Sequence, residues 1–219
     1  MAAVRKTMET PSPGPDRRMM PPVLRAFLWA FIGFIVFNAF TIFVDYSPQS
    51  PCLSQVGAVV GWFGALIGWL LGIGGYEYVI KPMLGYDPPA FSQVGWRRYF
   101  QVADDHKVVG IQYLMFSTGT FLLAGLIAMA MRVQLMNWRP TIFQYPENYL
   151  NAVGIHGTLM MFTVATVAMF GGLGNYMVPL MIGSRETVFS KLSGMGVWLV
   201  PVGVLTVAFS PLPGQWTTG

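Results

Sequence analysis

The sequence predicts an all-α, polytopic membrane protein, a transmembrane helical bundle of about five spans. Hydrophobic residues make up 54% of the 219-residue chain and charged residues only 10%, whereas soluble domains carry about a quarter charged residues. The few charges also stand in clusters, and between them lie five apolar stretches that are long enough for a helix to cross a bilayer. Composition and charge spacing therefore lead to the same fold class.

Charged side chains mark the ends of the predicted spans. The spans are expected at 26–44, at 56–75, between Lys107 and Arg132, between Glu147 and Arg185, and from Lys191 to about Leu212. Residues 1–25 form a polar, proline-rich tail, and no small-residue cleavage site follows the first apolar run. We therefore expect the first span to be a retained anchor and not a cleaved signal.

The distribution of Lys and Arg predicts that the N-terminus is cytoplasmic. Five basic residues precede the first span, none lies in the first loop, and four lie in the second loop. This distribution accounts for most of the net charge of +4, so no nucleic-acid partner is expected. The single cysteine, Cys52, falls in the outer loop at 45–55, so no intrachain disulfide and no thiolate metal cluster is expected.

Glycines recur at two places in the spans. Gly64, Gly68 and Gly72 stand every four residues in the second span, a pattern that lets membrane helices approach closely. The segment Gly171–Gly174 contains three glycines. It fits either close helix packing or the approach of a flat ligand to the backbone, and the sequence leaves both interpretations open.

His156 lies inside the predicted fourth span, in the stretch GIHGTLMMFTVATVAMFGGLGNYMVPLMIG. Such a histidine either hydrogen-bonds a neighbouring helix or serves function, because ionisable residues at membrane depth are costly; neutral imidazole is also a leading haem ligand. Arg132 closes the third span on the same side, and the connecting loop is short. We therefore expect the two side chains at similar depth, as a site for something anionic that also binds a metal.

Several segments together resemble one family. The stretch HGTLMMFTVATVAMFGGLGNYMVPLMIG and the following LSGMGVWLVP resemble the second and third helices of subunit I of haem-copper terminal oxidases, the cytochrome c and quinol oxidases. DHKVVGIQYL and AMAMRVQL resemble the entry and the end of that family's first helix, and GQWTTG resembles the start of a later conserved segment. The resemblance runs from about Asp105 to Gly219. It divides the chain into the tail 1–25, two extra helices at 26–75, an inner loop at 76–104 and three core helices at 105–219.

The resemblance implies roles for individual residues. His156 would be an axial ligand of the low-spin haem iron, and Arg132 would lie beside that haem and raise its potential. Asn175 would line the proton-uptake path from the inner side. In the inner loop this chain reads IGSRET, with Arg185 and Glu186 where the family has Pro and Asp at the entrance of that path, and Ser193 stands at the place of a later asparagine.

The chain contains only two histidines, His106 and His156, and the resemblance implies that the ligands of the high-spin haem and of copper lie on later helices. His106 is expected to be an exposed loop side chain. Because the sequence stops inside a motif, we expect either a truncated subunit or one half of a subunit that is split between two chains.

The predicted function is therefore part of the catalytic subunit of a respiratory oxidase in a bacterial or archaeal cell membrane, or an equivalent energy-transducing membrane. Electrons from cytochrome c or quinol would pass through the low-spin haem to a haem-copper centre that reduces oxygen to water, with proton pumping as an open question. The implied partners are other oxidase subunits and membrane lipid. The alternatives are a relative of the nitric-oxide reductases and a non-catalytic scaffold or assembly subunit of a respiratory complex.

Overall fold

The computed structural model describes residues 21–44, 55–86, 95–136, 138–185 and 187–209. Within these ranges the secondary structure is helical, and five helical stretches are long and apolar enough to cross a membrane. They are Pro22–Val44, Val56–Met83, His106–Met136, Pro146–Met181 and Ser190–Ala208. The all-α bundle of five spans is therefore confirmed, and the expected bounds differ from the observed ones mainly at the second span.

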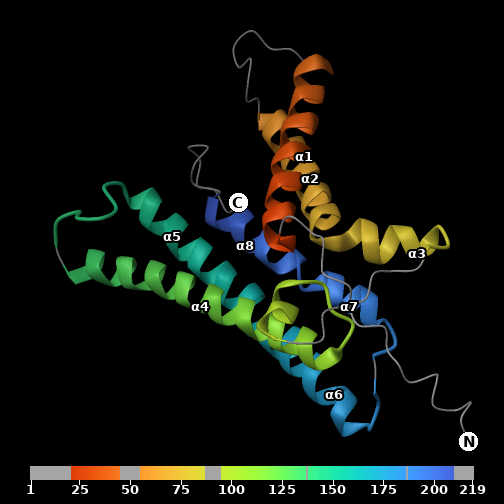
Figure 1. Ribbon diagram of the computed structural model, residues 1–219. Helices are drawn as coiled ribbons and strands as arrows, with labels where there is room; N and C mark the ends of the chain where they lie inside the picture. Colours follow the sequence, from red (N-terminus) through yellow and green to blue (C-terminus); the bar gives the residue numbers. More distant parts are fainter. Residues whose placement is uncertain (1–20, 45–54, 87–94, 137, 186, 210–219) are drawn as a thin grey trace, which may run out of the picture.

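The second span is longer than expected and bends. It consists of α2 (Gln55–Leu70), η2 (Leu71–Ile80) and the short α3 (Lys81–Met83). Gly74, with φ of 142°, interrupts the helix, because only glycine adopts this conformation without strain. Figure 1 shows the segment after this bend turning away from the direction of α2. The expected end at residue 75 is wrong as a helix end, since the helix continues past Glu77 in a new direction.

The first two spans form one tightly packed pair. The first span is α1 (Pro22–Val44), and Figure 1 shows it alongside α2. A Cβ added to Gly64 or Gly68 would overlap the backbone of Gly33 or Trp29 on α1, and one added to Gly72 would lie 2.6 Å from Ala26 Cα. The prediction that these glycines serve helix packing is confirmed.

The third and fourth spans form the second pair. The third is α4 (His106–Met136), and the fourth consists of α5 (Pro146–Thr158), η4 (Leu159–Gly174) and α6 (Asn175–Met181). They run antiparallel and side by side (Figure 1). Over η4 the fourth span is a π-helix, and the hydroxyl of Ser117 on α4 donates to the carbonyl of Val164 inside it, 3.0 Å away. That hydrogen bond ties the wider π turns to α4.

The fifth span lies against both pairs. It consists of α7 (Ser190–Gly196) and α8 (Leu199–Phe209), separated by Val197 and Trp198. Pro201 explains the break, because it has no N–H to donate to the carbonyl of Val197. That carbonyl accepts instead from the N–H of Val200, at 3.2 Å.

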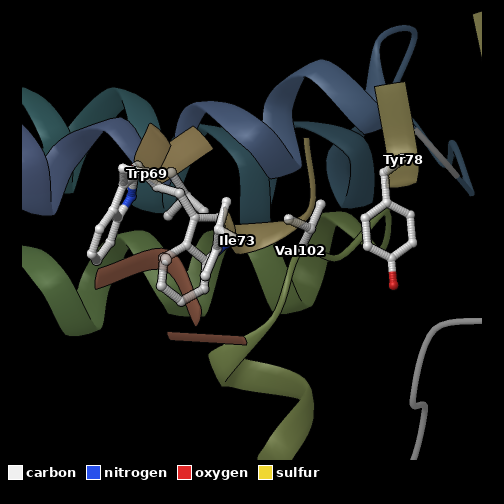
Figure 2. Packing of buried hydrophobic residues seen from close by; sticks show 7 residues of the cluster. Trp69, Ile73, Tyr78 and Val102 are labelled. Atoms are coloured by element: carbon white, nitrogen blue, oxygen red, sulfur yellow. The ribbon is translucent and has the colours of Figure 1, made fainter. Parts of the chain in front are cut away.

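A buried cluster joins the helix pair α1 and α2 to the rest of the chain. Figure 2 shows Trp69 and Ile73 of the second span close to Val102, which precedes α4. The other buried members are Ala26, Tyr78, Val197 and Trp198. The two extra helices are therefore packed into the bundle and are not a loosely attached appendage.

Candidate functional site

His156 lies on α5 and is held by the backbone of α4. Its Nδ1 is 3.0 Å from the carbonyl oxygen of Ala124, which is fully buried. A carbonyl only accepts, so Nδ1 carries the hydrogen and the lone pair of the neutral ring is on Nε2. Metal-binding histidines usually have this arrangement, with one nitrogen donating to a carbonyl and the other free for the metal.

Two glycines that neighbour the His156–Ala124 contact in the sequence are uncovered in the structure. A buried hydrophobic cluster lies at the contact between α4 and the fourth span and consists of Ala124, Ile155 and Leu159. Gly125 and Gly157, which adjoin Ala124 and His156 in the sequence, face open space, because a Cβ at either glycine has nothing within 4 Å. The donor chemistry of His156 and the uncovered backbone at these glycines would accommodate a haem held in part by this residue.

Arg132 does not share the depth of His156. The hydrogen bond to Ala124 places His156 level with that residue, and Arg132 is eight residues further along α4, about 12 Å at 1.5 Å per residue. The arginine is also exposed. The expectation of similar depth is wrong, because the helices pass each other at the level of Ala124 and not at the end of α4. A long arginine side chain can still reach along the helix surface.

Asn175 and Ser193 are brought together as a hydrogen-bonded pair. The Ser193 hydroxyl on α7 donates to Asn175 Oδ1 on α6, at 2.8 Å. The amide Nδ2 of Asn175 donates to the carbonyl oxygen of Gly171, also at 2.8 Å. Both side chains are partly buried. Residues that the sequence places 18 positions apart therefore form one continuous polar contact between two spans.

Tyr113 on α4 belongs to the same place, and the sequence reasoning missed it. Its ring packs on Gly171, where an added Cβ would lie 2.8 Å from the ring, and its hydroxyl lies 2.9 Å from the position of a Cβ on Gly196. Tyr113 is the only tyrosine between Lys107 and Arg132, and that isolated hydroxyl was the available signal. Gly171 and Gly172, against Tyr113 and Leu114, thus serve helix packing.

His106 is buried and not exposed as expected. It is the first residue of α4 and only 4% exposed, and neither ring nitrogen has a hydrogen-bond partner among the described residues. Asp105 Oδ1 is 3.8 Å from Nδ1. The segment before α4 folds back over the helix, because Gln112 Nε2 donates to the carbonyls of Tyr99 and Gln101. This segment covers the first turn of α4 and so buries His106, whereas an inner loop at 76–104 was expected to leave His106 exposed.

Three further features for which the sequence made predictions lie outside the described residues, namely Glu186, Cys52 and the GQWTTG segment. Arg185 is exposed. Among the described residues, no group of three or more His, Cys, Asp or Glu side chains could hold a metal ion.

Comparison with known proteins adds a direct likeness over the second half of the chain. The family model for cytochrome c and quinol oxidase polypeptide I matches residues 108–219, about half of the chain. Cytochrome c oxidase subunit 1 of Thermostichus vulcanus is 41% identical over 127 residues, which are 56% of this chain and 23% of that protein. The corresponding subunit of Synechocystis is 37% identical over the same shares.

A haem-copper oxidase subunit I+III of Aeropyrum pernix is 37% identical over 106 residues, 48% of this chain and 13% of that protein. The chain spans about a quarter of the length of the first two relatives. No solved structure matches it. The matched family region begins two residues into α4, and so the helices α1 and α2 lie before it.

Proposed function

This chain belongs to the cytochrome c and quinol oxidase polypeptide I family, and from that premise we propose that it forms the N-terminal part of the catalytic subunit of a respiratory haem-copper oxidase. His156 is an axial ligand of the low-spin haem in this proposal. The observation that carries it is the 3.0 Å contact of Nδ1 with the Ala124 carbonyl, which leaves Nε2 as the metal donor. A haem bound there would supply one-electron transfer from cytochrome c or quinol towards the centre that reduces oxygen.

The residues of this chain set the conditions for that haem. The Ala124 carbonyl fixes the tautomer and the ring orientation of His156, and it makes the imidazole a stronger ligand. The buried side chains Ile155 and Leu159 exclude water from one flank. Arg132 favours nearby anionic groups from a position closer to the outer end of α4.

We assign proton uptake to the polar contact around Gly171. The Ser193 and Asn175 side chains and the Tyr113 ring converge there from α7, α6 and α4. Hydroxyl and amide groups both donate and accept, so they can order water between them. Glu186, in the loop before α7, is the proposed proton collector, with Arg185 beside it favouring the ionised carboxylate.

The haem role is tested by difference spectroscopy on the complete enzyme. We expect the reduced-minus-oxidised spectrum of His156→Ala to lack the low-spin band, and that of His106→Gln to keep it, because both variants remove a buried or half-buried histidine but only one removes the proposed ligand. An unchanged band in His156→Ala would refute the assignment. Absence of haem from the purified wild-type protein would favour the scaffold subunit instead.

A further inference from the structure

The contact between the second span and the break in the fifth is a buried hydrogen bond. The indole Nε1–H of Trp69 on α2 donates to the carbonyl oxygen of Trp198, at 2.8 Å, across 129 residues of sequence. Trp69 is 3% exposed and Trp198 is 1% exposed. A buried hydrogen bond to a backbone carbonyl fixes the position of the main chain it touches.

The carbonyl lies at the break in the fifth span. Val197 and Trp198 separate α7 from α8, and Pro201 denies the usual helical hydrogen bond to Val197. The two halves of the span can therefore change their relative direction more easily than an unbroken helix can. The ring of Phe116 on α4 packs edge-on against Trp198, with the ring centres 5.4 Å apart, and so supports the break from the other side.

The short helix on the near side of the break carries Ser193. Gly194 packs directly on the backbone of Ala103, and Gly196 lies against the Tyr113 hydroxyl. Met195 packs against the buried cluster that contains Trp69 and Ile73. Gly194 and Gly196 thus tie α7 to α4 and the segment before it, whereas Met195 ties it to the second span, where its methyl carbon would lie 3.1 Å from a Cβ on Gly75. The position of α7, and with it the 2.8 Å hydrogen bond from Ser193 to Asn175, therefore depends in part on packing supplied by the second span.

The second span is itself anchored at this level. Arg25 at the start of α1 donates through Nε to the carbonyl of Gly72, at 2.6 Å, and its Nη1 lies 3.1 Å from Glu77 Oε1. The Phe27 ring stands edge-on to Trp69, with the ring centres 4.9 Å apart. The Phe27 contact thus holds Trp69 from α1, and the Arg25 contacts fix the same span further along the chain.

We propose that the two helices before the family region position the proton-uptake residues, with Trp69 as a positioning residue that fixes the break in the fifth span and so the Ser193–Asn175 contact. Trp69 itself touches neither Ser193 nor a reacting group in this assignment. The inference rests on the proposed function only in that it treats Ser193 and Asn175 as proton-uptake residues. The positioning of Ser193 by Trp69 is a structural statement that can be tested without oxidase activity.

The test uses the accessibility of residue 193 in the full chain. A Ser193→Cys reporter in a Cys52→Ser background is labelled with a small membrane-permeant thiol reagent. Adding Trp69→Phe removes the N–H donor and keeps an aromatic ring, and we expect labelling to rise roughly three- to tenfold, the factor that one lost hydrogen bond permits. Trp62→Phe is the matched control, since Trp62 is on the same helix but packs on Phe34 and is 37% exposed.

Equal labelling of the Trp69→Phe protein and its parent would overturn the inference. If the Trp69→Phe protein does not insert into the membrane, Phe27→Leu provides the test, because Phe27 is half exposed and its loss frees the Trp69 ring without removing it. We expect labelling of residue 193 to rise, by a smaller factor than in Trp69→Phe. Unchanged labelling would refute the inference.

In the complete enzyme with native Ser193, Trp69→Phe should slow proton uptake and leave the low-spin haem band unchanged. A loss of the band in parallel with uptake would show a general folding defect and overturn the positioning role. Wild-type protein without haem would refute the proposed function, while the labelling result would stand independently.

Discussion

At the scale of single residues, Ser193 gives the most direct test of the proton-uptake assignment. Among the described residues, Ser193→Ala removes the donor to Asn175 Oδ1 and leaves the hydrogen bond from Asn175 Nδ2 to the Gly171 carbonyl. We expect proton uptake to slow several-fold while stability falls by only about 1 kcal/mol, the usual worth of one hydrogen bond. Rates are measured from proton uptake by the reconstituted enzyme during turnover.

Thr206→Ala is the control for that experiment. Thr206 also lies on the fifth span, and its hydroxyl donates to the carbonyl of Val202 in its own helix, at 2.8 Å. This variant should leave proton uptake unchanged. Equal slowing in both variants would mean that hydroxyls in the fifth span affect packing and not the path.

Replacing either of two buried polar residues of α4, Gln112 or His106, with leucine should have different effects on the stability of the protein. Gln112→Leu removes both hydrogen bonds that its amide donates to the carbonyls of Tyr99 and Gln101, so we expect a loss of about 1–3 kcal/mol in the free energy of unfolding. His106→Leu removes ring nitrogens that have no hydrogen-bond partner among the described residues and lie no closer than 3.8 Å to the exposed Asp105 carboxylate, so its effect should be near zero or stabilising. Thermal unfolding of the detergent-solubilised protein compares them, and a larger loss for His106→Leu would contradict this account.

At this scale the sequence points to candidate site residues more readily than to their partners. Asn175 and Ser193 are candidates through the family resemblance, and His156 is a candidate both through that resemblance and through the cost of an ionisable group in a span. The Ala124 carbonyl that orients His156 is invisible in the sequence, because every residue has a carbonyl and only the crossing of two helices selects one. The burial of His106 was missed for the same reason, since it depends on a segment that folds back over α4.

At the scale of the helices, a substitution at Gly68 tests how much the close packing of α1 against α2 stabilises the protein. Gly68→Ala forces its Cβ against the backbone of Trp29, and a backbone cannot yield as a flexible side chain can. We expect a loss of about 1–3 kcal/mol from overpacking, seen as a lower unfolding temperature of the purified protein. Gly119→Ala on α4 is the control, because nothing lies within 4 Å of its Cβ. An equal loss in both variants would show that helix contact is not the cause.

Helix ends are predicted only partly by charge. The spans between Lys107 and Arg132 and between Glu147 and Arg185 correspond to His106–Met136 and Pro146–Met181, because polar residues there coincide with the ends of the helices. In the second span Glu77 is paired with Arg25, so the helix passes it and Gly74 sets the change of direction instead. The break at Val197 also has a local cause in Pro201, which apolar composition alone does not reveal.

At the scale of the whole molecule, two antiparallel helix pairs share the fifth span (Figure 1). One pair lies before the family region and the other carries His156, and the fifth span carries Ser193 between them. Large apolar side chains remain exposed on the outer faces of the helices, as expected for surfaces that contact lipid or further helices. The broken fifth span therefore joins the helix pair with the proposed haem site to the helix pair that precedes the matched family region.

The orientation of this assembly in the membrane follows from charge and can be tested directly. A cytoplasmic N-terminus puts the third loop outside and the fourth inside. Trp138, 90% exposed, lies in the third loop and Val188, 91% exposed, in the fourth. In a Cys52→Ser background, a membrane-impermeant thiol reagent applied to intact cells should label Trp138→Cys and not Val188→Cys.

Permeabilising the cells should make the Val188→Cys protein as reactive as the Trp138→Cys protein. This control distinguishes a position that faces the cytoplasm from one that is buried in the protein. Labelling of Val188→Cys alone in intact cells would reverse the orientation. His156 would then lie towards the cytoplasm, and Asn175, about 28 Å further along if the helix had α-helical rise throughout, would lie towards the outside. Proton uptake from the cytoplasm through Asn175 and Ser193 requires the first result, so this labelling pattern decides whether the proposed path faces the side from which protons are taken.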